Sequence, residues 1–202
     1  MFRNHRRRSG LSDEAKAKTD IAIRDMVLAD IPRVMELERA IFPDPWSVAA
    51  FKQQVTEKDW GGLVAESDGM VIGYACYYMV AGEAHLTNIG VEPNYRRKSV
   101  AKQLLDNILQ FVADNECEYI FLEVRPSNSG AITFYEKFGF DVLYRRPNYY
   151  RKPVEDALVM LSTGAEDLAE GKPWRDGTPP PAAQAALLEH CERFAGDRAT
   201  RY

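Results

Sequence analysis

The chain has 202 residues, 46% hydrophobic and 28% charged, as expected for a soluble globular protein with one domain-sized core and some additional segments. Its formal net charge of −4 argues against a protein that binds nucleic acid through bulk positive charge, so no direct nucleic-acid binding is expected. Its three cysteines and three histidines are too scattered to predict a disulfide framework or a metal site, and no apolar run approaches the roughly 20 residues of a membrane span, so a cytoplasmic setting is expected.

The chain is predicted to begin with a flexible arm, followed by a strand and a helix. Residues 1–19 are polar and basic, which indicates an arm outside the core. Brief alternation of apolar and polar residues over 21–24 indicates a first strand. Asp30 is then expected to cap a helix whose apolar residues recur on one face.

A break follows this helix at residues 42–47. It contains two prolines, and Ser47 is expected to cap a second short helix that runs through Val55. The pattern leaves two interpretations of Phe42 and Trp46 in the break. They wall a peptide groove between the two helices, or they are packing residues.

The centre of the chain is predicted to be a meander of antiparallel strands. Strands are expected over 62–66, 70–80 and 84–91, separated by turns at 67–69 and 81–83. The last strand leads directly into a basic loop, so the meander ends in a strand–loop–helix unit.

The loop and helix after the meander have the pattern of an anion site. A helix is expected from about Ser99 to Asp114, and the first backbone N–H groups of a helix have no intrahelical partner. Arg96, Arg97 and Lys98 add positive charge immediately before it. The alternative is an ordinary strand-to-helix turn whose basic residues are solvated, and the local pattern leaves both open.

Glu123 is the exceptional residue of the next predicted strand, an apolar run over 119–124. The strand–helix–strand order predicts that this strand lies parallel to the strand over 84–91. A carboxylate near the C-terminal end of a buried strand is costly unless it is paired or exposed at a ligand site. The alternative is a strand-end glutamate that reaches solvent.

The last part of the domain is predicted to form a helix and two strands. Asn128 or Ser129 is expected to cap the helix, and Gly139 is expected to end it. Strands are expected over 140–145 and 157–161, with a loop between them at 147–151.

The composition changes after Leu161. The predicted elements lie in a domain over 20–161, and prolines and glycines over 162–181 predict a linker. An amphipathic pattern predicts a helical tail over 182–202, which docks on the domain, contacts a second subunit or remains loose.

Over residues 20–161 the sequence resembles the GNAT superfamily of acetyl-CoA-dependent N-acetyltransferases. The core signature of that family, Arg/Gln-x-x-Gly-x-Gly/Ala, is seen here from Arg96 to Ala101. In the family its backbone amides hold the pyrophosphate of acetyl-CoA. The chain departs from the signature at Ser99, where the family usually has glycine. A serine still offers its N–H and can cap the helix. Its Cβ stands where the backbone and the phosphate approach closely, which can weaken cofactor binding.

Five separated segments are similar to the bacterial RimI type, a family that acetylates the N-terminal alanine of ribosomal protein bS18. The resemblance implies an α/β GNAT fold, with a mixed, mostly antiparallel central sheet, a parallel splayed strand pair and flanking helices. The five segments are Phe42–Ser47, Asn88–Val91, Leu122–Asn128, Ala131–Phe140 and Asn148–Tyr150.

The resemblance also implies roles for individual residues. Glu123 matches the general base and Tyr135 the general acid, although Tyr135 is also readable as a core aromatic of its helix. Asn128 matches the residue that contacts the pantetheine arm. Glu83 either helps to attract a cationic substrate or is a solvated turn residue. The cofactor-binding set further includes Ile89, Gly90, Val91, Arg96, Arg97, Lys98, Ser99, Val100 and Ala101, and the substrate-binding set is Phe42, Trp46, Asn148 and Tyr149.

The function implied by the resemblance is acetyl transfer from acetyl-CoA to the N-terminal α-amine of a protein, with bS18 as the expected substrate. The alternatives are a GNAT enzyme that acts on lysine side chains or small amines, and a non-catalytic GNAT-like binding module. The oligomeric state stays open between a monomer and a weak dimer.

Overall fold

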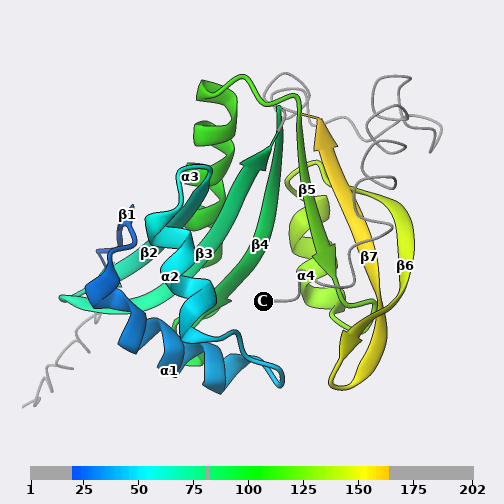
Figure 1. Ribbon diagram of the computed structural model, residues 1–202. Coiled ribbons are helices and arrows are strands. Elements are labelled where there is room, and N and C mark those ends of the chain that lie inside the picture. The colour runs from blue at the N-terminus through cyan, green and yellow to red at the C-terminus, as the bar shows by residue number, and fades with distance from the viewer. Residues whose placement is uncertain (1–19, 81, 164–202) are drawn as a thin grey trace, which may run out of the picture.

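The computed structural model describes residues 20–80 and 82–163, which form a seven-stranded sheet with helices on both faces (Figure 1). The strand order is β1-β2-β3-β4-β5-β7-β6, and all neighbours are antiparallel except β4 and β5. The expected mixed, mostly antiparallel sheet with a parallel pair is therefore confirmed. The elements are β1 (Ala22–Asp25), η1 (Leu28–Asp30), α1 (Ile31–Ile41), α2 (Val48–Thr56), β2 (Trp60–Ser67), β3 (Met70–Val80), β4 (Glu83–Val91), η2 (Pro93–Tyr95), α3 (Val100–Asp114), β5 (Tyr119–Val124), α4 (Ser129–Glu136), β6 (Asp141–Arg151) and β7 (Val154–Thr163).

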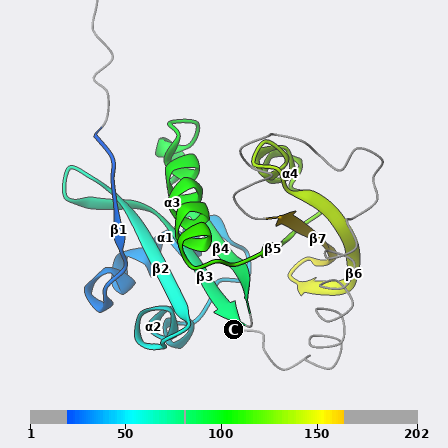
Figure 2. The same cartoon turned by 90° about the horizontal axis from the view of Figure 1, so that it is seen from above.

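The helices divide the core into two layers, one on each face of the sheet (Figure 2). Because strand side chains alternate between faces, the central strands β2 and β3 contribute to both layers. On one face, Val34 of α1 and Phe51 of α2 pack with Tyr74 of β3. On the other face, Leu104 of α3 packs in the same cluster as Leu122 of β5.

The parallel pair β4 and β5 separates partway along its length. The pairing begins at Glu83 with Tyr119 and ends at Leu86 with Leu122. Beyond that point β4 remains paired with β3, and β5 remains paired with β7. The expected splay is thus produced by each strand keeping its other neighbour, and Figure 1 shows the two strands diverging.

The caps expected for α2 and α4 are confirmed, but the cap expected from Asp30 is wrong. Ser47 Oγ accepts a hydrogen bond from the N–H of Ala50, and Asn128 Oδ1 accepts one from Ala131, each at 3.2 Å. Asp30 precedes α1 without a side-chain cap. Its carboxylate is occupied elsewhere, which removes it from the helix terminus.

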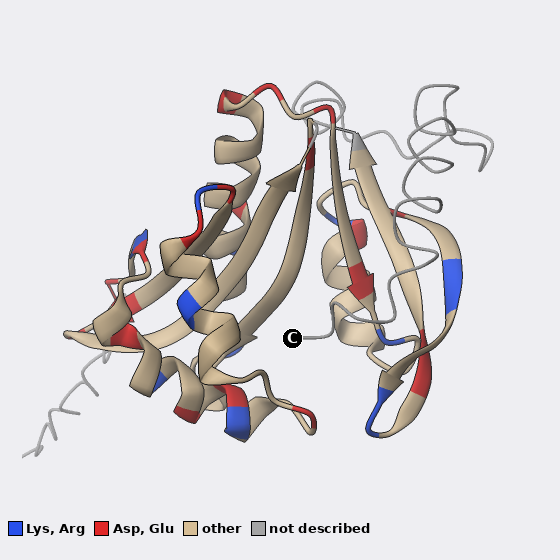
Figure 3. Cartoon of the chain, viewed as in Figure 1, with Lys and Arg blue, Asp and Glu red and all other residues tan. Residues whose placement is uncertain are grey.

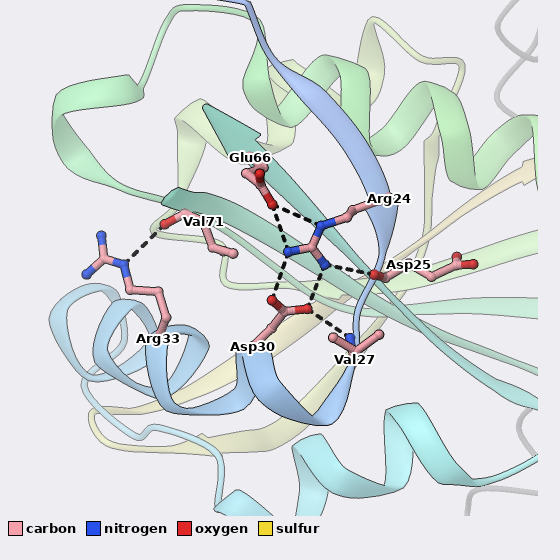
Figure 4. A network of polar contacts seen from close by, with 7 residues as sticks. All are labelled: Arg24, Asp25, Val27, Asp30, Arg33, Glu66 and Val71. Carbon is pink, nitrogen blue, oxygen red and sulfur yellow. Dashed lines mark hydrogen bonds and ion pairs between the residues drawn. The ribbon is translucent and has the colours of Figure 1, made fainter. Parts of the chain in front are cut away.

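Asp30 belongs to an ion-pair network that attaches β1 to the rest of the domain (Figure 4). The Arg24 guanidinium lies 2.7 Å from Asp30 Oδ2 and 2.8 Å from Glu66 Oε2 on β2. Asp30 also accepts a hydrogen bond from the N–H of Val27 at 2.8 Å. The hydrogen bonds from Arg24 lower the pKa of the Asp30 carboxyl, so the charged carboxylate is stabilised. Its oxygens are engaged by Arg24 and by the N–H of Val27, and not by the first N–H groups of α1.

The last hairpin differs from the expectation in its strand boundaries. β6 continues to Arg151 through the segment expected as a loop, with a register shift between Arg146 and Tyr150. Pro147 is tolerated because β6 is an edge strand and the shift leaves Pro147 outside the regular pairing. β7 runs to Thr163, so the linker expected from residue 162 starts two residues too early. The arm, the rest of the linker and the tail lie outside the described residues.

Within residues 20–80 and 82–163, no helix has both the length and the apolar content needed to cross a membrane. The same residues contain no cluster of three or more His, Cys, Asp or Glu side chains able to hold a metal ion. Cys76 and Cys117 are buried free thiols, and they fill the core as small hydrophobic residues.

Candidate active site

Glu123 is the first residue of β5 beyond the last parallel pair with β4. Its side chain is 19% exposed, and Oε1 lies 3.6 Å from Nη1 of Arg146 on β6. Burial raises the pKa of the Glu123 carboxyl, while the charges of His85 and Arg146 act in the opposite direction. A carboxyl whose pKa is raised in this way is suited to accept a proton near neutral pH.

His85 of β4 is a buried group of this site that the sequence pattern did not single out. Its ring stacks on Tyr78 at 4.5 Å and on Phe121 at 5.3 Å between ring centroids. Its Nε2 lies 3.5 Å from Oε2 of Glu83, which is itself buried. The interpretation of Glu83 as a solvated turn residue is therefore wrong.

The strand register contains the signal that would have located His85. Side chains two residues apart in a strand point to one face, and His85 is paired with Phe121. Glu83 and His85 therefore share a face with Phe121 and Glu123. The spacing of the histidines along the chain does not show this neighbourhood, because it depends on the pairing of two strands.

Two tyrosines of β6 lie beside Glu123. The hydroxyl of Tyr150 donates a hydrogen bond to the backbone carbonyl of Glu123 at 3.2 Å, and the Tyr149 ring packs edge-on against Tyr150 at 4.9 Å. The charge of Glu123, followed by burial, raises the pKa of Tyr149. Asn148 precedes them with φ of 53°, and its N–H donates to Asp156 at 2.9 Å. The structure therefore places Tyr149 next to Glu123, with the exposed Asn148 at the bulge.

Tyr135 of α4 is buried in the core layer opposite to the one that contains Phe51. Its ring lies 5.7 Å from that of Phe140, so its interpretation as a core aromatic is correct for the ring. Burial raises the pKa of its hydroxyl, which stays protonated at neutral pH. Burial, the charge of Glu123 and the charge of Tyr135 all raise the pKa of Tyr150, so Tyr150 lies within electrostatic reach of both predicted catalytic residues.

The loop before α3 has the backbone shape of an anion cradle. Arg97 and Ser99 both have left-handed φ, at 60° and 63°. Such turns, followed by a helix, direct successive N–H groups toward one point. Arg96, Arg97 and Lys98 are exposed there, and Lys98 Nζ lies 4.8 Å from the centroid of the Tyr95 ring. These residues fit a bound pyrophosphate.

Ser99 does not cap α3 through its side chain, so that expectation is wrong. The left-handed φ gives the physical reason why glycine suits this position better, since a Cβ is strained there. The side chain of Val100 is buried in the core, so only its backbone is available to the cradle, and Ala101 is half-buried.

Residues 89–91 of β4, which are predicted to bind the cofactor, lie beyond the last pair with β5. They pair with β3 on one side, and within the described residues their edge toward β5 has no strand partner. That edge can offer backbone groups to an extended ligand. Gly90 is required because a Cβ there would lie 2.6 Å from the Tyr74 ring. Asn128 is exposed at the start of α4, with Oδ1 engaged in its cap.

Glu38 of α1 is a further buried carboxylate, and the sequence pattern did not single it out. Its side chain accepts hydrogen bonds from the backbone N–H of Trp46 at 2.8 Å, from Asn88 Nδ2 at 3.1 Å and from the Tyr74 hydroxyl. The residue is 1% exposed, and burial raises the pKa of its carboxyl. Glu38 thus connects the α1–α2 loop to the diverging part of β4.

Phe42 and Trp46 in that loop are half-buried and pack against the core layer of α1 and α2. The Trp46 ring lies 5.4 Å from Phe51. The packing interpretation is correct for both residues, and their contact with a peptide stays a prediction.

The β6–β7 turn contacts both the β5–α4 connection and the α1–α2 loop. Arg125 donates hydrogen bonds to the carbonyls of Lys152 at 3.0 Å and Pro153 at 3.1 Å. Lys152 Nζ lies 3.2 Å from Asp44 Oδ1. Figure 3 shows charged residues at the end of the α1–α2 loop and at this turn. The turn therefore bridges the α1–α2 loop and the connection that follows β5.

Comparisons with known proteins agree with this geometry. The Acetyltransferase (GNAT) family matches residues 31–140. A Bacillus subtilis (strain 168) protein with the provisional name ribosomal protein bS18-alanine N-acetyltransferase is 37% identical over 147 residues, covering 72% of this chain and 97% of that protein. The ribosomal protein bS18-alanine N-acetyltransferase of Escherichia coli (strain K12) is 31% identical over 140 residues, covering 68% and 94%.

A solved structure gives the same result for the fold. The crystal structure of the ribosomal-protein-S18-alanine N-acetyltransferase from Escherichia coli has a TM-score of 0.66 and 29% identity, covering 73% of this chain and 98% of that one. The resemblance to RimI-type enzymes is confirmed by these relatives. The chain therefore belongs to the GNAT family and is an acetyl-CoA-dependent N-acetyltransferase.

Proposed function

We propose that this enzyme acetylates the N-terminal α-amine of a protein, with the N-terminal alanine of ribosomal protein bS18 as its substrate. The observation that carries the proposal is the near-complete coverage of two relatives whose names state this activity, at 97% and 94% of their lengths. Glu123 and Tyr135 provide the base and the acid, and both act electrostatically on Tyr150.

Glu123 prepares the amine for attack. An N-terminal amine has a pKa of about 8, so it is largely protonated at neutral pH and must lose a proton. The Glu123 carboxylate, with its raised pKa, takes that proton directly or through a water. Buried Glu83, close to His85, adds negative charge that attracts the cationic form of the substrate.

The cofactor side provides binding and a proton donor. When bound, acetyl-CoA supplies a thioester as the acetyl source. The amides that follow Arg96 hold its pyrophosphate, while the free edge of residues 89–91 and the amide of Asn128 hold the pantetheine arm. A backbone N–H near Gly90 stabilises negative charge on the thioester oxygen. Tyr135, protonated at neutral pH, gives its hydroxyl proton to the departing sulfur.

The contact between the β6–β7 turn and the α1–α2 loop supports the N-terminus of a chain, rather than an internal lysine, as the acetylated group. The ion pair of Lys152 with Asp44 joins the β6–β7 turn to the α1–α2 loop. From an N-terminal residue the substrate chain continues in one direction only, so one segment has to pass this bridge. From an internal lysine the chain continues in both directions, so two segments have to pass it. Phe42, Trp46 and Tyr149 then contact the first residues of the substrate.

The test is a peptide assay with the purified chain and acetyl-CoA. Two peptides share one sequence that begins with Ala-Arg and contains an internal lysine, and one of them has a blocked N-terminus. We expect acetylation of the α-amine in the free peptide and none of the blocked one, located by fragment mass spectrometry. Acetylation of the lysine in both would reject the proposed substrate class. Mass spectrometry of bS18 from a strain lacking the gene, which should show an unmodified N-terminus, tests the named substrate.

A further inference from the structure

Arg146 on β6 places a permanent positive charge against the carboxylate of Glu123. Its Nη1 lies 3.6 Å from Glu123 Oε1, and both side chains are mostly buried, at 25% and 19% exposure. The guanidinium also lies 5.0 Å from the centroid of the Tyr149 ring, close enough for a cation–π contact. Arg146 is therefore held between a predicted catalytic residue and a predicted substrate-binding residue.

The neighbouring Arg145 provides a contrast within the same strand. Its side chain is 59% exposed, and its Nη1 lies 3.4 Å from Asp156 Oδ2. Successive residues of a strand point to opposite faces, which explains why only one of the two arginines reaches Glu123. The register shift that begins after Arg146 places Tyr149 beside it. Two adjacent residues of one type thus have different environments, which makes Arg145 a matched control.

We propose that Arg146 is a positioning residue for Glu123, whose guanidinium engages Oε1 and leaves Oε2 to take the proton of the substrate amine. This inference rests on the proposed role of Glu123 as the base. An ion pair to one oxygen fixes the rotation of the carboxylate, since the guanidinium cannot lose its own proton in the working pH range. The other oxygen then keeps a constant direction.

Arg146 differs from His85, the other group whose positive charge lowers the pKa of Glu123, in that its charge is permanent. Burial raises the pKa of Glu123, and His85 and Arg146 lower it. His85, stacked on Tyr78, is positive only when protonated, whereas the guanidinium stays charged. Loss of Arg146 should therefore raise the pKa of Glu123. The other titratable or charged groups nearby are Glu83 on β4, Tyr149 and Tyr150 on β6, Tyr135 on α4, and Arg125 after β5.

The same charge acts on the substrate. A cation close to a bound amine disfavours the protonated amine, so Arg146 lowers the pKa of an amine held against Glu123. The amine is then more readily neutral, which is the form that attacks. Both effects of Arg146 extend activity toward lower pH.

The experiment is a pH profile of kcat/KM for the peptide, measured with the full chain at constant ionic strength. Two breaks are expected in the logarithm of kcat/KM. The first, at about pH 8, marks the change of the free peptide amine between its neutral and cationic forms. The second lies at the pKa of Glu123, below which the logarithm of kcat/KM falls with a slope of one, because the carboxylate that takes the proton of the cationic amine is lost. We expect Arg146→Met to move this second break upward by about one pH unit or more, the lower end of the effect of an adjacent arginine.

Two further arginine variants make the result specific. Arg146→Lys retains a positive charge and should keep most of the parental break. Arg145→Gln should leave the break unchanged. If the second break in Arg146→Met and Arg146→Lys coincides with that of the parent enzyme, the inference is wrong.

Glu123→Gln separates this inference from the proposed function. If this variant loses turnover and the second break while Arg146→Met leaves the break in place, only the role of Arg146 is rejected. If Glu123→Gln retains both turnover and the break, Glu123 is not the base, and the inference about Arg146 falls with that role, while the peptide assay decides the proposed substrate separately.

Discussion

Glu38 and Glu123 are two carboxylates withdrawn from water, and burial raises the pKa of both. Glu38 accepts hydrogen bonds from Trp46, Tyr74 and Asn88. Glu123 is held by charges instead, with Arg146 at 3.6 Å, which is beyond hydrogen-bond length. A carboxylate whose lone pairs are filled by neighbouring donors fixes structure. One held by a more distant charge keeps an oxygen able to accept a proton.

The largest effect is expected from Glu123→Gln. Glutamine has the same shape but cannot act as a base, so kcat should fall by about 100-fold to 10,000-fold, the usual contribution of a general base. The dissociation constant for acetyl-CoA should stay the same, because Glu123 lies apart from the phosphate cradle. Steady-state kinetics and calorimetry measure the two quantities. A parallel loss of both would assign Glu123 a structural role.

Glu38→Leu should have the largest effect on stability. It leaves the donors of Trp46, Tyr74 and Asn88 unpaired, and each unpaired buried donor costs about 1–3 kcal/mol. We expect the free energy of unfolding, from urea titration at neutral pH, to fall by about 3 kcal/mol or more. Glu36→Leu on the same helix is the control, since its carboxylate is 64% exposed and pairs only with Arg33. Equal losses in the two variants would contradict the structural role of Glu38.

Glu38→Gln should change how stability depends on pH. The folded-state pKa of Glu38 is raised above its unfolded value, so the native state holds this proton more tightly. The resulting stabilisation is fully present below the unfolded pKa, at about 4.5, and is lost as the pH rises through the folded pKa. Glutamine does not titrate. The free energy of unfolding of the parent minus that of the variant should therefore decrease as the pH rises, and a difference independent of pH would show that Glu38 titrates normally.

Ser99→Gly is expected to improve the phosphate cradle by a smaller amount. Glycine adopts the left-handed φ of 63° without strain, which should raise the free energy of unfolding by up to about 1 kcal/mol. It also removes a Cβ from the phosphate site, so the affinity for acetyl-CoA should increase. Ser99→Ala is the control, because it keeps the Cβ and removes only a hydroxyl that makes no cap. A gain in affinity with alanine as large as with glycine would refute the backbone explanation.

The smallest effect is expected from Lys152→Ala. The ion pair with Asp44 is exposed, and such pairs contribute less than about 1 kcal/mol. The KM for the peptide should rise by no more than about fivefold at low ionic strength, and the difference from the parent should vanish in high salt. An increase in KM that persists in high salt would indicate that Lys152 contacts the substrate directly.

The parts of the fold predicted correctly depend on local pattern. The strand over 119–124 and the Ser47 cap are encoded within a few residues, so the sequence was sufficient for them. The Asp30 cap was wrong because Arg24, which lies outside the helix, is a stronger partner for its carboxylate. The course of β6 past Pro147 depends on pairing with β7, which local composition does not encode.

The site was predicted where a family signature covered it and was missed where long-range contacts build it. Glu123 and Tyr149 come together beside the point where the strands diverge, and the loop before α3 has the left-handed turns of an anion cradle. The bonds of Glu38 to Tyr74 and Asn88 cross 36 and 50 residues of sequence. No helical or strand period relates such positions, so only the fold reveals them.

The separation of β4 from β5 has a consequence for redesign. Its width is set by backbone pairing, because each strand is held by its outer neighbour as the two part. Exchanging the side chain of Glu123, the first residue of β5 beyond the pairing, therefore leaves this backbone separation in place. A scaffold of this kind allows the residues at the strand divergence to be re-selected by their chemistry, while the pairing that holds the two strands apart stays the same from one variant to the next.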